Sequence, residues 1–347
     1  MEQLGIGIIG TGHIARSHLR SLKAHPPARV VGVYDVIPER AQAAAQEFEV
    51  PFVAPSLEAL LERSDIDAVI VATPPYAHKD PTIAALKAGK HVLCEKPFAL
   101  DPSEAEEMTR TAEQAGKYLA VCSARQRCGA AARRAHELVV SGALGKVYHA
   151  RSSAYRVRGR PGIDILRENT WFIDKKLAGG GALIDIGVYQ IDKLLWLLGN
   201  PRVTNVLATT FMGIGTPAPA PLVQDVEDHA TVMFTCDNGA SGILEIAWAS
   251  NISGVDTFIV LGSEAGLRFN PLTLITAGRY SRNAVEERLL NVPDGDTTGF
   301  GDVSQQFVNA ILAGREPYTP ARDALEVTRV IDAAYRSAET GKPVSLL

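Results

Sequence analysis

The eight residues "IIGTGHIA", numbered 8–15, contain the motif that says most about the architecture. They place Gly10, Gly12 and Ala15 in the spacing G-x-G-x-x-A, between an apolar strand pattern and a segment with helical spacing. Glycines here allow a tight turn and a close approach of the backbone to a pyrophosphate, and the helix start offers N–H groups and the positive end of its dipole. The predicted cofactor-binding residues of this turn are Gly10, Gly12, His13 and Ile14.

An acidic residue follows at the spacing that a dinucleotide site needs. Asp35 ends the second strand pattern, 20 residues after Ala15, where a carboxylate binds the ribose hydroxyls. A carboxylate accepts hydrogen bonds from the 2′-hydroxyl and repels a 2′-phosphate. Residues 36–38 offer no arginine to a phosphate, although Arg40 follows on the next helix pattern. The sequence therefore favours NAD over NADP as cofactor.

Strand and helix patterns alternate through about residue 124, and the strands are nearly continuous apolar runs. This is typical of a parallel sheet covered by helices on both faces. The later strands are longer and are separated by turns such as "DNG", residues 237–239, which indicate hairpins. We predict an α/β plus α+β protein. Residues 1–124 form a doubly wound parallel sheet, and residues 125–347 form an α+β domain with a large open, mostly antiparallel sheet.

Composition excludes several classes of protein. The chain has 347 residues and a formal net charge of −4, whereas a nucleic-acid-binding protein usually has a basic domain or stripe. No run reaches the ~18 uncharged apolar residues of a membrane span, and the N-terminus lacks the basic region of a signal peptide. The four cysteines are scattered without metal-ligand spacing. We expect a cytoplasmic protein with reduced thiols, no metal, no nucleic-acid partner and no membrane association.

A third apolar strand pattern ends at "ATPPYAH", residues 72–78. Ligands bind beyond the carboxyl ends of parallel strands, so this segment faces the same crevice as the glycine turn. We assign Ala72, Thr73, Pro74 and His78 to the cofactor site. For His78 the alternative is a cap on the following helix.

The next strand pattern ends in "LCEKPFAL", residues 93–100, where Pro97 stops the strand. Glu95 and Lys96 therefore also point to the crevice, and we assign both to the cofactor site. A lysine held by this turn beside a nicotinamide can polarise a carbonyl or orient a hydroxyl. Glu95 would keep the lysine charged and in position. The alternative is an exposed ion pair of small energetic value.

The sequence resembles the glucose–fructose oxidoreductase / inositol dehydrogenase / rhizopine-catabolism (Gfo/Idh/MocA) oxidoreductases over nearly its whole length. The resemblance implies a Rossmann fold for the first domain and assigns to Lys96 the family's catalytic lysine, which contacts nicotinamide and substrate. The matching segments are "GIIGTGHIA", "ATPPYAH", "AGKHVLCEKP", "GGGALIDIGVYQID", "EDHATVMF" and "DAL".

A second polar set lies in "GGGALIDIGVYQID", residues 179–192. On a helix that starts after Gly181, the side chains of Asp185, Tyr189 and Asp192 share one face. In the family this face looks into the cleft opposite the lysine, positions the substrate hydroxyl and moves its proton. Without that role, Asp185 would cap the helix and Asp192 would be exposed to solvent.

The chain departs from the family pattern at Tyr189, which stands where inositol dehydrogenase-like members carry histidine. Other branches carry tyrosine here. A nearby Lys96 ammonium would lower the pKa of the phenol from its usual ~10, so Tyr189 could act as acid and base. The alternative is that Tyr189 only binds the substrate and water accepts the proton. We predict Lys96, Asp185 and Tyr189 as catalytic residues.

Further substrate contacts are predicted at Arg127, Trp171 and Asp192. Arg127, like Arg125, follows the last strand pattern of the first domain, where family members often contact substrate or cofactor. Trp171 either walls the nicotinamide pocket or packs. The arginines of "RVRGR", residues 156–160, would suit an acidic substrate if the loop covers the cleft, and otherwise form a solvated or oligomer-facing loop.

These residues predict an NAD(P)-dependent oxidoreductase that transfers hydride between nicotinamide and the hydroxyl or carbonyl group of a sugar, polyol or sugar derivative. One alternative is a non-catalytic dinucleotide-binding sensor, because fold alone does not determine function. Another is an enzyme that keeps NAD(H) tightly bound and recycles it. The resemblance also implies a homodimer or homotetramer formed through the C-terminal sheet.

Overall fold

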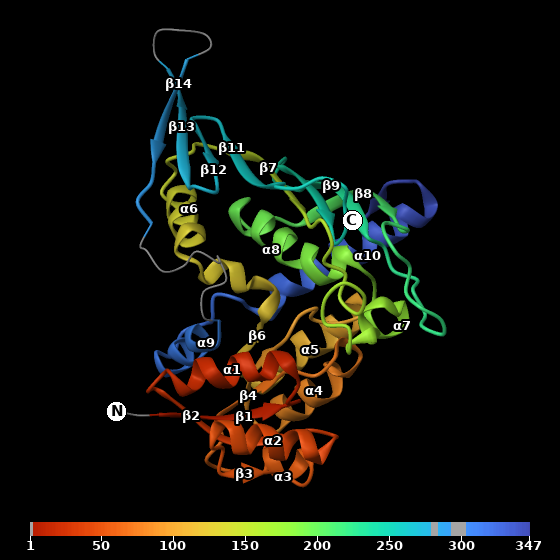
Figure 1. Ribbon diagram of the computed structural model, residues 1–347. Coiled ribbons are helices and arrows are strands. Elements are labelled where there is room, and N and C mark those ends of the chain that lie inside the picture. The colour runs from red at the N-terminus through yellow and green to blue at the C-terminus, as the bar shows by residue number, and fades with distance from the viewer. Residues whose placement is uncertain (1–2, 279–283, 293–302) are drawn as a thin grey trace. The chain divides into compact units, whose positions relative to one another are not determined.

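A computed structural model describes residues 3–278, 284–292 and 303–347. The chain divides into two compact units. Unit 1 holds the described residues up to Cys128 and those from Val303 to Leu325, and unit 2 holds the described residues from Gly129 to Val292 and Glu326–Leu347. Figure 1 colours both by position along the chain.

Unit 1 contains a six-stranded parallel sheet in the order β3-β2-β1-β4-β5-β6 (Figure 1). The strand order reverses between β1 and β4, and such a switch point is where doubly wound sheets bind their ligands. The predicted doubly wound architecture is confirmed. The strands are β1 (Leu4–Ile9), β2 (Ala28–Tyr34), β3 (Phe52–Val53), β4 (Ala68–Val71), β5 (His91–Cys94) and β6 (Leu119–Val121).

Helices pack against the unit 1 sheet through apolar positions at helical spacing. On α1, for example, Ala15, Leu19 and Leu22 are buried. The helices are α1 (His13–Lys23), α2 (Pro38–Phe48), α3 (Leu57–Leu61), α4 (Lys79–Lys87), α5 (Pro102–Ala115) and α9 (Val303–Leu312), with the short 3₁₀ segments η1 (Pro75–Ala77) and η2 (Cys122–Cys128).

The predicted domain boundary differs from this division in two respects. Unit 1 extends to Cys128 rather than to residue 124, and a segment of the C-terminal region belongs to it. The reason is packing: Val303, Phe307 and Val308 of α9 join the buried cluster that contains Leu19 of α1. The first unit is therefore discontinuous in sequence.

Unit 2 contains a nine-stranded sheet in the order β14-β13-β12-β11-β7-β10-β9-β8-β15. Among the described strands of this sheet, the β7–β10 pair alone is parallel, as expected from the hairpin signals. The strands are β7 (Val147–Tyr155), β8 (Val203–Phe211), β9 (His229–Cys236), β10 (Ser241–Ala247), β11 (Asp256–Gly262), β12 (Ala265–Arg268), β13 (Thr273–Ala277), β14 (Val285–Leu289) and β15 (Val344–Ser345).

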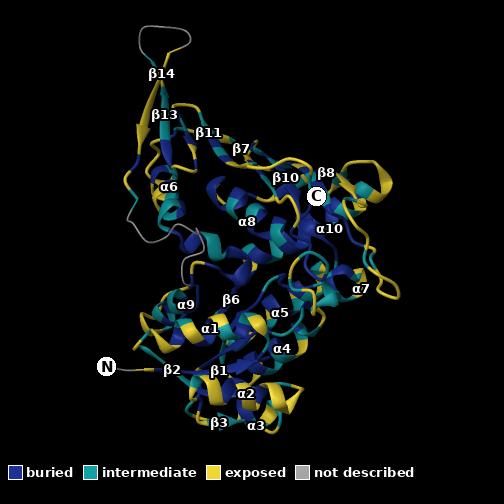
Figure 2. Ribbon diagram, in the orientation of Figure 1, coloured by how far each residue is buried: buried dark blue, intermediate teal, exposed yellow. Residues whose placement is uncertain are grey.

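One face of this sheet packs against helices. Val232 of β9 and Leu244 of β10 share a buried cluster with Ile191 and Leu194 of α8 (Val188–Leu197), and Figure 2 shows α8 largely buried. A short π-helical segment, η4 (Leu183–Gly187), precedes α8. The other helices are α6 (Ala130–Val140), η3 (Thr170–Ile173), α7 (Lys175–Ala178) and α10 (Ala321–Thr340), within which the two units divide.

None of the helices in the described ranges is long and apolar enough to span a bilayer.

Candidate active site

The glycine turn joins the end of β1 to the start of α1 in unit 1. Gly10 has φ +84°, and a Cβ there would lie 2.8 Å from the carbonyl oxygen of Ala72, so this position requires glycine. A Cβ on Gly12 would meet nothing within 4 Å, and Gly12 precedes α1 without a side-chain cap. Open space above uncapped N–H groups is what a pyrophosphate needs, so the turn fits a dinucleotide. His13 is exposed and Ile14 half-buried at the same helix start.

Asp35 lies beside this turn. Its Oδ2 accepts hydrogen bonds from the backbone N–H of Thr11 at 2.7 Å and from the Thr11 hydroxyl at 2.9 Å, while Oδ1 accepts from the Ile37 N–H at 2.9 Å. A carboxylate oxygen has about two acceptor positions, so Oδ1 retains capacity for a ribose hydroxyl. Thr11 was not predicted as a site residue, although its hydroxyl inside the G-x-G motif was a signal.

The residues predicted at the end of β4 lie at the same edge of the parallel sheet. Ala72 is buried, and Thr73 and Pro74 are half-buried. The imidazole of His78 is 1% exposed, with Nδ1 2.8 Å from the carbonyl oxygen of Pro97 and Nε2 2.9 Å from that of Thr73. His78 therefore links the ends of β4 and β5. Because both ring nitrogens face these carbonyl oxygens, the arrangement does not favour the predicted cofactor contact. The side chain makes no cap bond to α4, so the alternative helix cap is not favoured either.

Glu95 and Lys96 follow β5, whose carboxyl end lies at the same sheet edge as the glycine turn. Glu95 is 3% exposed, so the alternative of an exposed ion pair is wrong. Its Oε1 lies 2.9 Å from His18 Nε2 and accepts a hydrogen bond from Arg125 Nη2 at 2.6 Å. Its Oε2 accepts the backbone N–H of Lys96 at 2.9 Å. Lys96 itself is half-buried.

The charge of Glu95 is set by these neighbours. Burial alone would raise the pKa of the Glu95 carboxyl, but the Arg125 guanidinium and the His18 imidazole outweigh burial and hold that pKa well below its usual range. Glu95 is thus an ionised carboxylate that holds the backbone of Lys96. A role for Glu95 in positioning Lys96 was predicted from the sequence, but its partner His18 was not.

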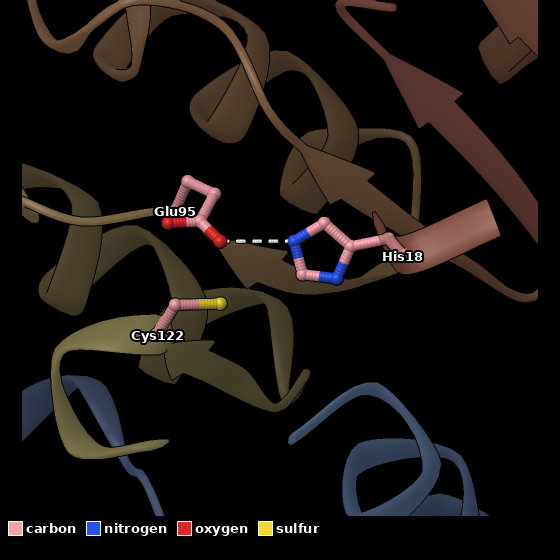
Figure 3. A group of neighbouring side chains, drawn as sticks. All are labelled: His18, Glu95 and Cys122. Atoms are coloured by element: carbon pink, nitrogen blue, oxygen red, sulfur yellow. Dashed lines mark hydrogen bonds and ion pairs between the residues drawn. The ribbon is translucent and has the colours of Figure 1, made fainter. Parts of the chain in front are cut away.

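Figure 3 shows His18, Glu95 and the thiol of Cys122 facing one another, with donor atoms within 4.8 Å. Two observations argue against a cation here. The Glu95 oxygen that faces His18 also receives Arg125. Burial raises the pKa of the Cys122 thiol well above its ordinary value, which disfavours the thiolate that a metal would need. We interpret the cluster as a hydrogen-bonded network.

In unit 2 the glycine run before η4 allows a close backbone approach. A Cβ on Gly180 would lie 2.0 Å from the Tyr335 hydroxyl, and one on Gly181 would lie 2.0 Å from the carbonyl oxygen of Glu227. The Glu227 carboxylate accepts the N–H groups of Gly181 and Leu183 at 2.8 Å each and the Tyr335 hydroxyl at 3.0 Å. This buried side chain therefore fixes the start of the segment that carries the predicted catalytic residues.

That segment buries all three predicted polar residues. Asp185, Tyr189 and Asp192 are 7%, 7% and 0% exposed, so the alternative of a solvent-exposed Asp192 is wrong. Asp185 lies within η4 rather than at its N-cap, which is Ala182. Its Oδ2 accepts a hydrogen bond from Trp248 Nε1 at 2.8 Å. Trp248 was missed, because "EIAWAS" reads simply as the end of an apolar strand.

The other predicted substrate contacts, Arg127 and Trp171, have different surroundings. Arg127 is 2% exposed and donates to Asp323 Oδ2 at 2.6 Å within unit 1, an arrangement that does not favour the predicted substrate contact. Trp171 is half-buried and stacks on Phe172 with ring centroids 3.8 Å apart.

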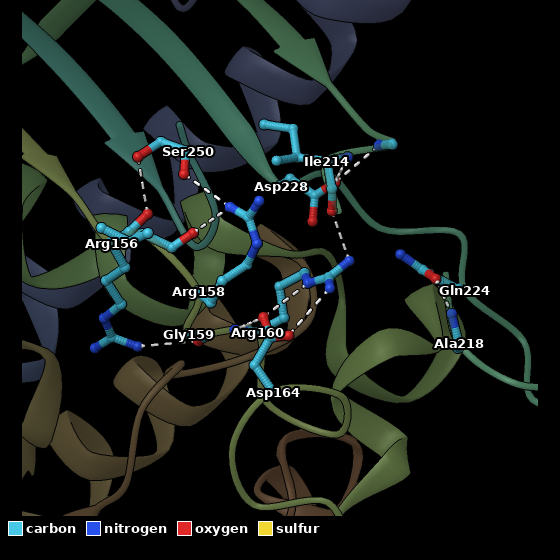
Figure 4. A network of polar contacts seen from close by, with 12 residues as sticks. Arg156, Arg158, Gly159, Arg160, Asp164, Ile214, Ala218, Gln224, Asp228 and Ser250 are labelled. Carbon is cyan, nitrogen blue, oxygen red and sulfur yellow. Dashed lines mark hydrogen bonds and ion pairs between the residues drawn. The ribbon is translucent and has the colours of Figure 1, made fainter. Parts of the chain in front are cut away.

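The arginine-rich loop is largely bound to its own unit (Figure 4). Arg160 is 2% exposed, pairs with both carboxylate oxygens of Asp164 at 2.9 and 3.1 Å and donates to the carbonyl of Ile214 at 2.7 Å. Arg158 donates to the Ser250 carbonyl at 2.8 Å. Arg156 donates to the Gly159 carbonyl at 3.4 Å. Because all three guanidinium groups donate to groups of their own unit, the loop does not favour an acidic substrate.

Comparison with known proteins finds a family match in each unit. A family model described as "Oxidoreductase family, NAD-binding Rossmann fold" matches residues 4–123, and one described as "GFO/IDH/MocA C-terminal domain" matches residues 132–268. The chain belongs to the Gfo/Idh/MocA oxidoreductase family. The predicted family and enzyme class are confirmed.

Several members of the Gfo/Idh/MocA family are similar over nearly their whole length. D-glucoside 3-dehydrogenase of Escherichia coli (strain K12) is 31% identical over 99% of this chain and 97% of its own. 1,5-anhydro-D-fructose reductase of Ensifer adhaerens is 32% identical over 98% of each chain. GenD2 from gentamicin A biosynthesis, solved in complex with NAD, is 29% identical with TM-score 0.80, covering 100% of this chain and 97% of its own.

Proposed function

We propose that this oxidoreductase transfers hydride between NAD(H) and a hydroxyl or carbonyl carbon of a sugar, polyol or sugar derivative. The observation that carries the proposal is the position of Lys96, directly after β5 at the sheet edge where the glycine turn offers its uncapped helix start. Relatives named for dehydrogenation or reduction of glucosides and anhydro-sugars support the substrate class.

Each site residue has a separate role in this proposal. The nicotinamide, when bound, accepts or donates the hydride. The Lys96 ammonium donates hydrogen bonds to the reacting oxygen and stabilises negative charge on it. Tyr189 exchanges the proton with that oxygen, or binds the substrate while water takes the proton. Asp185, oriented by Trp248, completes the proton path, and Asp192 and Trp171 contact the substrate.

The preference for NAD rests on Asp35. Its carboxylate is fixed by Thr11 and Ile37 close to the glycine turn, where a 2′-phosphate would meet a negative charge. Asp35→Ser should reduce the preference for NAD over NADP, measured as the ratio of the two kcat/KM values. An unchanged ratio would rule out Asp35 as the discriminating residue.

We also propose that the protein acts in the cytoplasm as a homodimer or homotetramer through the nine-stranded sheet. Leu207 of β8 and Met233 of β9 are paired in register and are 43% and 46% exposed on the sheet face opposite the buried cluster. Light scattering after gel filtration tests this directly. A monomer at micromolar concentration would refute it, and Met233→Arg should weaken the assembly.

The first experiment is a turnover screen. Purified protein is incubated with NAD or NADP and a panel of aldoses, inositols, aldonates, uronates and glucosides, while reduced cofactor is followed by absorbance. Turnover that is lost in Lys96→Ala supports the proposal. Cofactor binding without turnover on any compound favours a sensor. Reduced nucleotide that co-purifies and does not exchange favours an enzyme that recycles its cofactor.

A further inference from the structure

A chain of buried hydrogen bonds leads from the C-terminal segment of unit 1 to the predicted catalytic lysine. The hydroxyl of Ser304, on α9, lies 2.7 Å from His18 Nδ1, and His18 Nε2 lies 2.9 Å from Glu95 Oε1 (Figure 3 draws the second contact). Glu95 Oε2 then accepts the N–H of Lys96. Ser304, His18 and Glu95 are only 2–4% exposed, so water cannot readily replace these partners.

The Glu95 carboxylate is held from both sides. Arg125 donates to the same Oε1 that faces His18, at 2.6 Å, while Oε2 is occupied by the backbone of the next residue. A carboxylate that cannot rotate fixes the peptide N–H that it accepts. The orientation of residue 96 thus depends on His18 and Arg125, neither of which lies near it in sequence.

Two other interpretations of the cluster are weaker. A metal would have to displace Arg125 from Glu95, as described above. A hydrolytic Ser–His–Glu arrangement would need a nucleophile that a substrate can reach, but Ser304 is 2% exposed at the start of α9. Neither interpretation explains why Glu95 also holds the backbone of Lys96, whereas a positioning role does.

We propose that His18 is a positioning residue for Lys96: it fixes the Glu95 carboxylate, and α9 supplies Ser304 to fix His18. The inference rests on the proposed function, in which Lys96 is catalytic. It also assigns a role to the return of the chain to unit 1, because α9 brings Ser304 to a histidine 286 residues earlier in the sequence.

The test compares His18→Leu with His18→Gln and Ser304→Ala. Leucine fills the buried site without a donor, whereas the glutamine amide can still donate to Glu95. Because small displacements of a catalytic group are costly, His18→Leu should lower kcat by about tenfold to 100-fold, with the dissociation constant of NADH changed less than about threefold. Glutamine should restore kcat to within about threefold of the wild type, and Ser304→Ala should lie between them.

His25→Leu is the matched control. Its imidazole Nε2 contacts Asn309 Oδ1 at 2.9 Å, which also links the α1 region to α9 but does not reach Glu95. It should lower thermal stability without lowering kcat. The proposal is wrong if folded His18→Leu keeps wild-type kcat, if glutamine fails to rescue, or if His25→Leu reduces kcat equally.

A second readout does not depend on turnover. Hydrogen exchange of the Lys96 amide, which donates to Glu95, should become about tenfold faster in His18→Leu and stay unchanged in His25→Leu. If no sugar is turned over but this difference is found, the proposed function fails while the positioning network stands. Unchanged exchange in His18→Leu would refute the network itself.

Discussion

Each unit has a buried carboxylate that holds the backbone beside its predicted catalytic residues, and the two are compensated differently. In unit 1, Glu95 accepts the N–H of Lys96, the Arg125 guanidinium supplies positive charge, and the His18 imidazole forms a further hydrogen bond. The Arg125 guanidinium and His18 outweigh the effect of burial, and the pKa of the carboxyl falls well below its ordinary value.

In unit 2, Glu227 accepts two backbone N–H groups and the Tyr335 phenol, none of which carries a positive charge. Burial outweighs these hydrogen bonds and raises the pKa of the Glu227 carboxyl. The comparison shows that dipoles are enough to orient a buried carboxylate, but that full charges are needed to keep it strongly ionised.

The largest expected effect is a fall in kcat when Lys96, whose backbone Glu95 holds in unit 1, loses its charge. Lys96→Met keeps the length of the side chain and removes its charge, so kcat should fall by about 10²- to 10⁴-fold while NADH still binds. Steady-state kinetics and NADH fluorescence titration measure the two quantities. Tyr189→Phe is the corresponding variant of the predicted catalytic residues in unit 2, and the same two quantities are measured for it. If kcat falls only slightly in Lys96→Met, the assignment of the lysine is wrong.

The next effect concerns the backbone that Glu227 holds. Gly181→Ala would place a Cβ 2.0 Å from the Glu227 carbonyl oxygen, and the main chain must move to relieve the overlap. The free energy of unfolding should fall by about 1–3 kcal/mol, as for overpacked sites. Gly266→Ala is the control, because its nearest contact would be 3.3 Å. Equal losses in the two variants would show that the glycine run has no special packing role.

The two carboxylates should also respond to pH with opposite signs. Below the ordinary carboxyl value of 4.5, the unfolded chain binds a proton at Glu95 that the folded protein, with its lowered pKa, does not bind. The wild type therefore loses stability relative to Glu95→Gln as the pH falls. Glu227 has a raised pKa, so the wild type gains stability relative to Glu227→Gln as the pH falls from neutrality towards 4.5. Denaturant unfolding between pH 7 and 3.5 measures both differences. The same sign for both pairs would contradict the comparison.

The smallest effect is expected at Trp248, which holds the Asp185 side chain rather than a backbone. Trp248→Phe removes the indole N–H that donates at 2.8 Å and keeps an aromatic ring in the site. A lost hydrogen bond of about 1 kcal/mol corresponds to a fall in kcat of roughly three- to tenfold, with little change in KM. A change confined to KM would indicate that Trp248 acts on substrate binding instead.

The sequence predicted the parts of the site that local motifs encode. The glycine turn and Lys96 each follow a strand end that can be recognised within a few residues. Long-range partners have no such signal. His18 looked like one more residue on the buried face of a helix, and Ser304 is 286 positions away.

The assignment of α9 to unit 1 had no local signal for the same reason. The pattern of α9 predicts a helix with one apolar face, but it does not indicate against which apolar surface of the chain that face packs. Trp248 and Asp185 are likewise 63 residues apart and meet only because the sheet brings the end of β10 to η4.

The return of the chain to unit 1 has a consequence for biosynthesis. Emerging from the ribosome, residues up to Cys128 contain every strand of the parallel sheet, but Val303, Phe307 and Val308 of its buried cluster follow much later. Strands β7 to β14 of unit 2 are synthesised in the interval. Synthesis of unit 1 therefore begins first, but its core is complete only after α9 has been synthesised. A fragment ending at Cys128 would expose that part of the core to water.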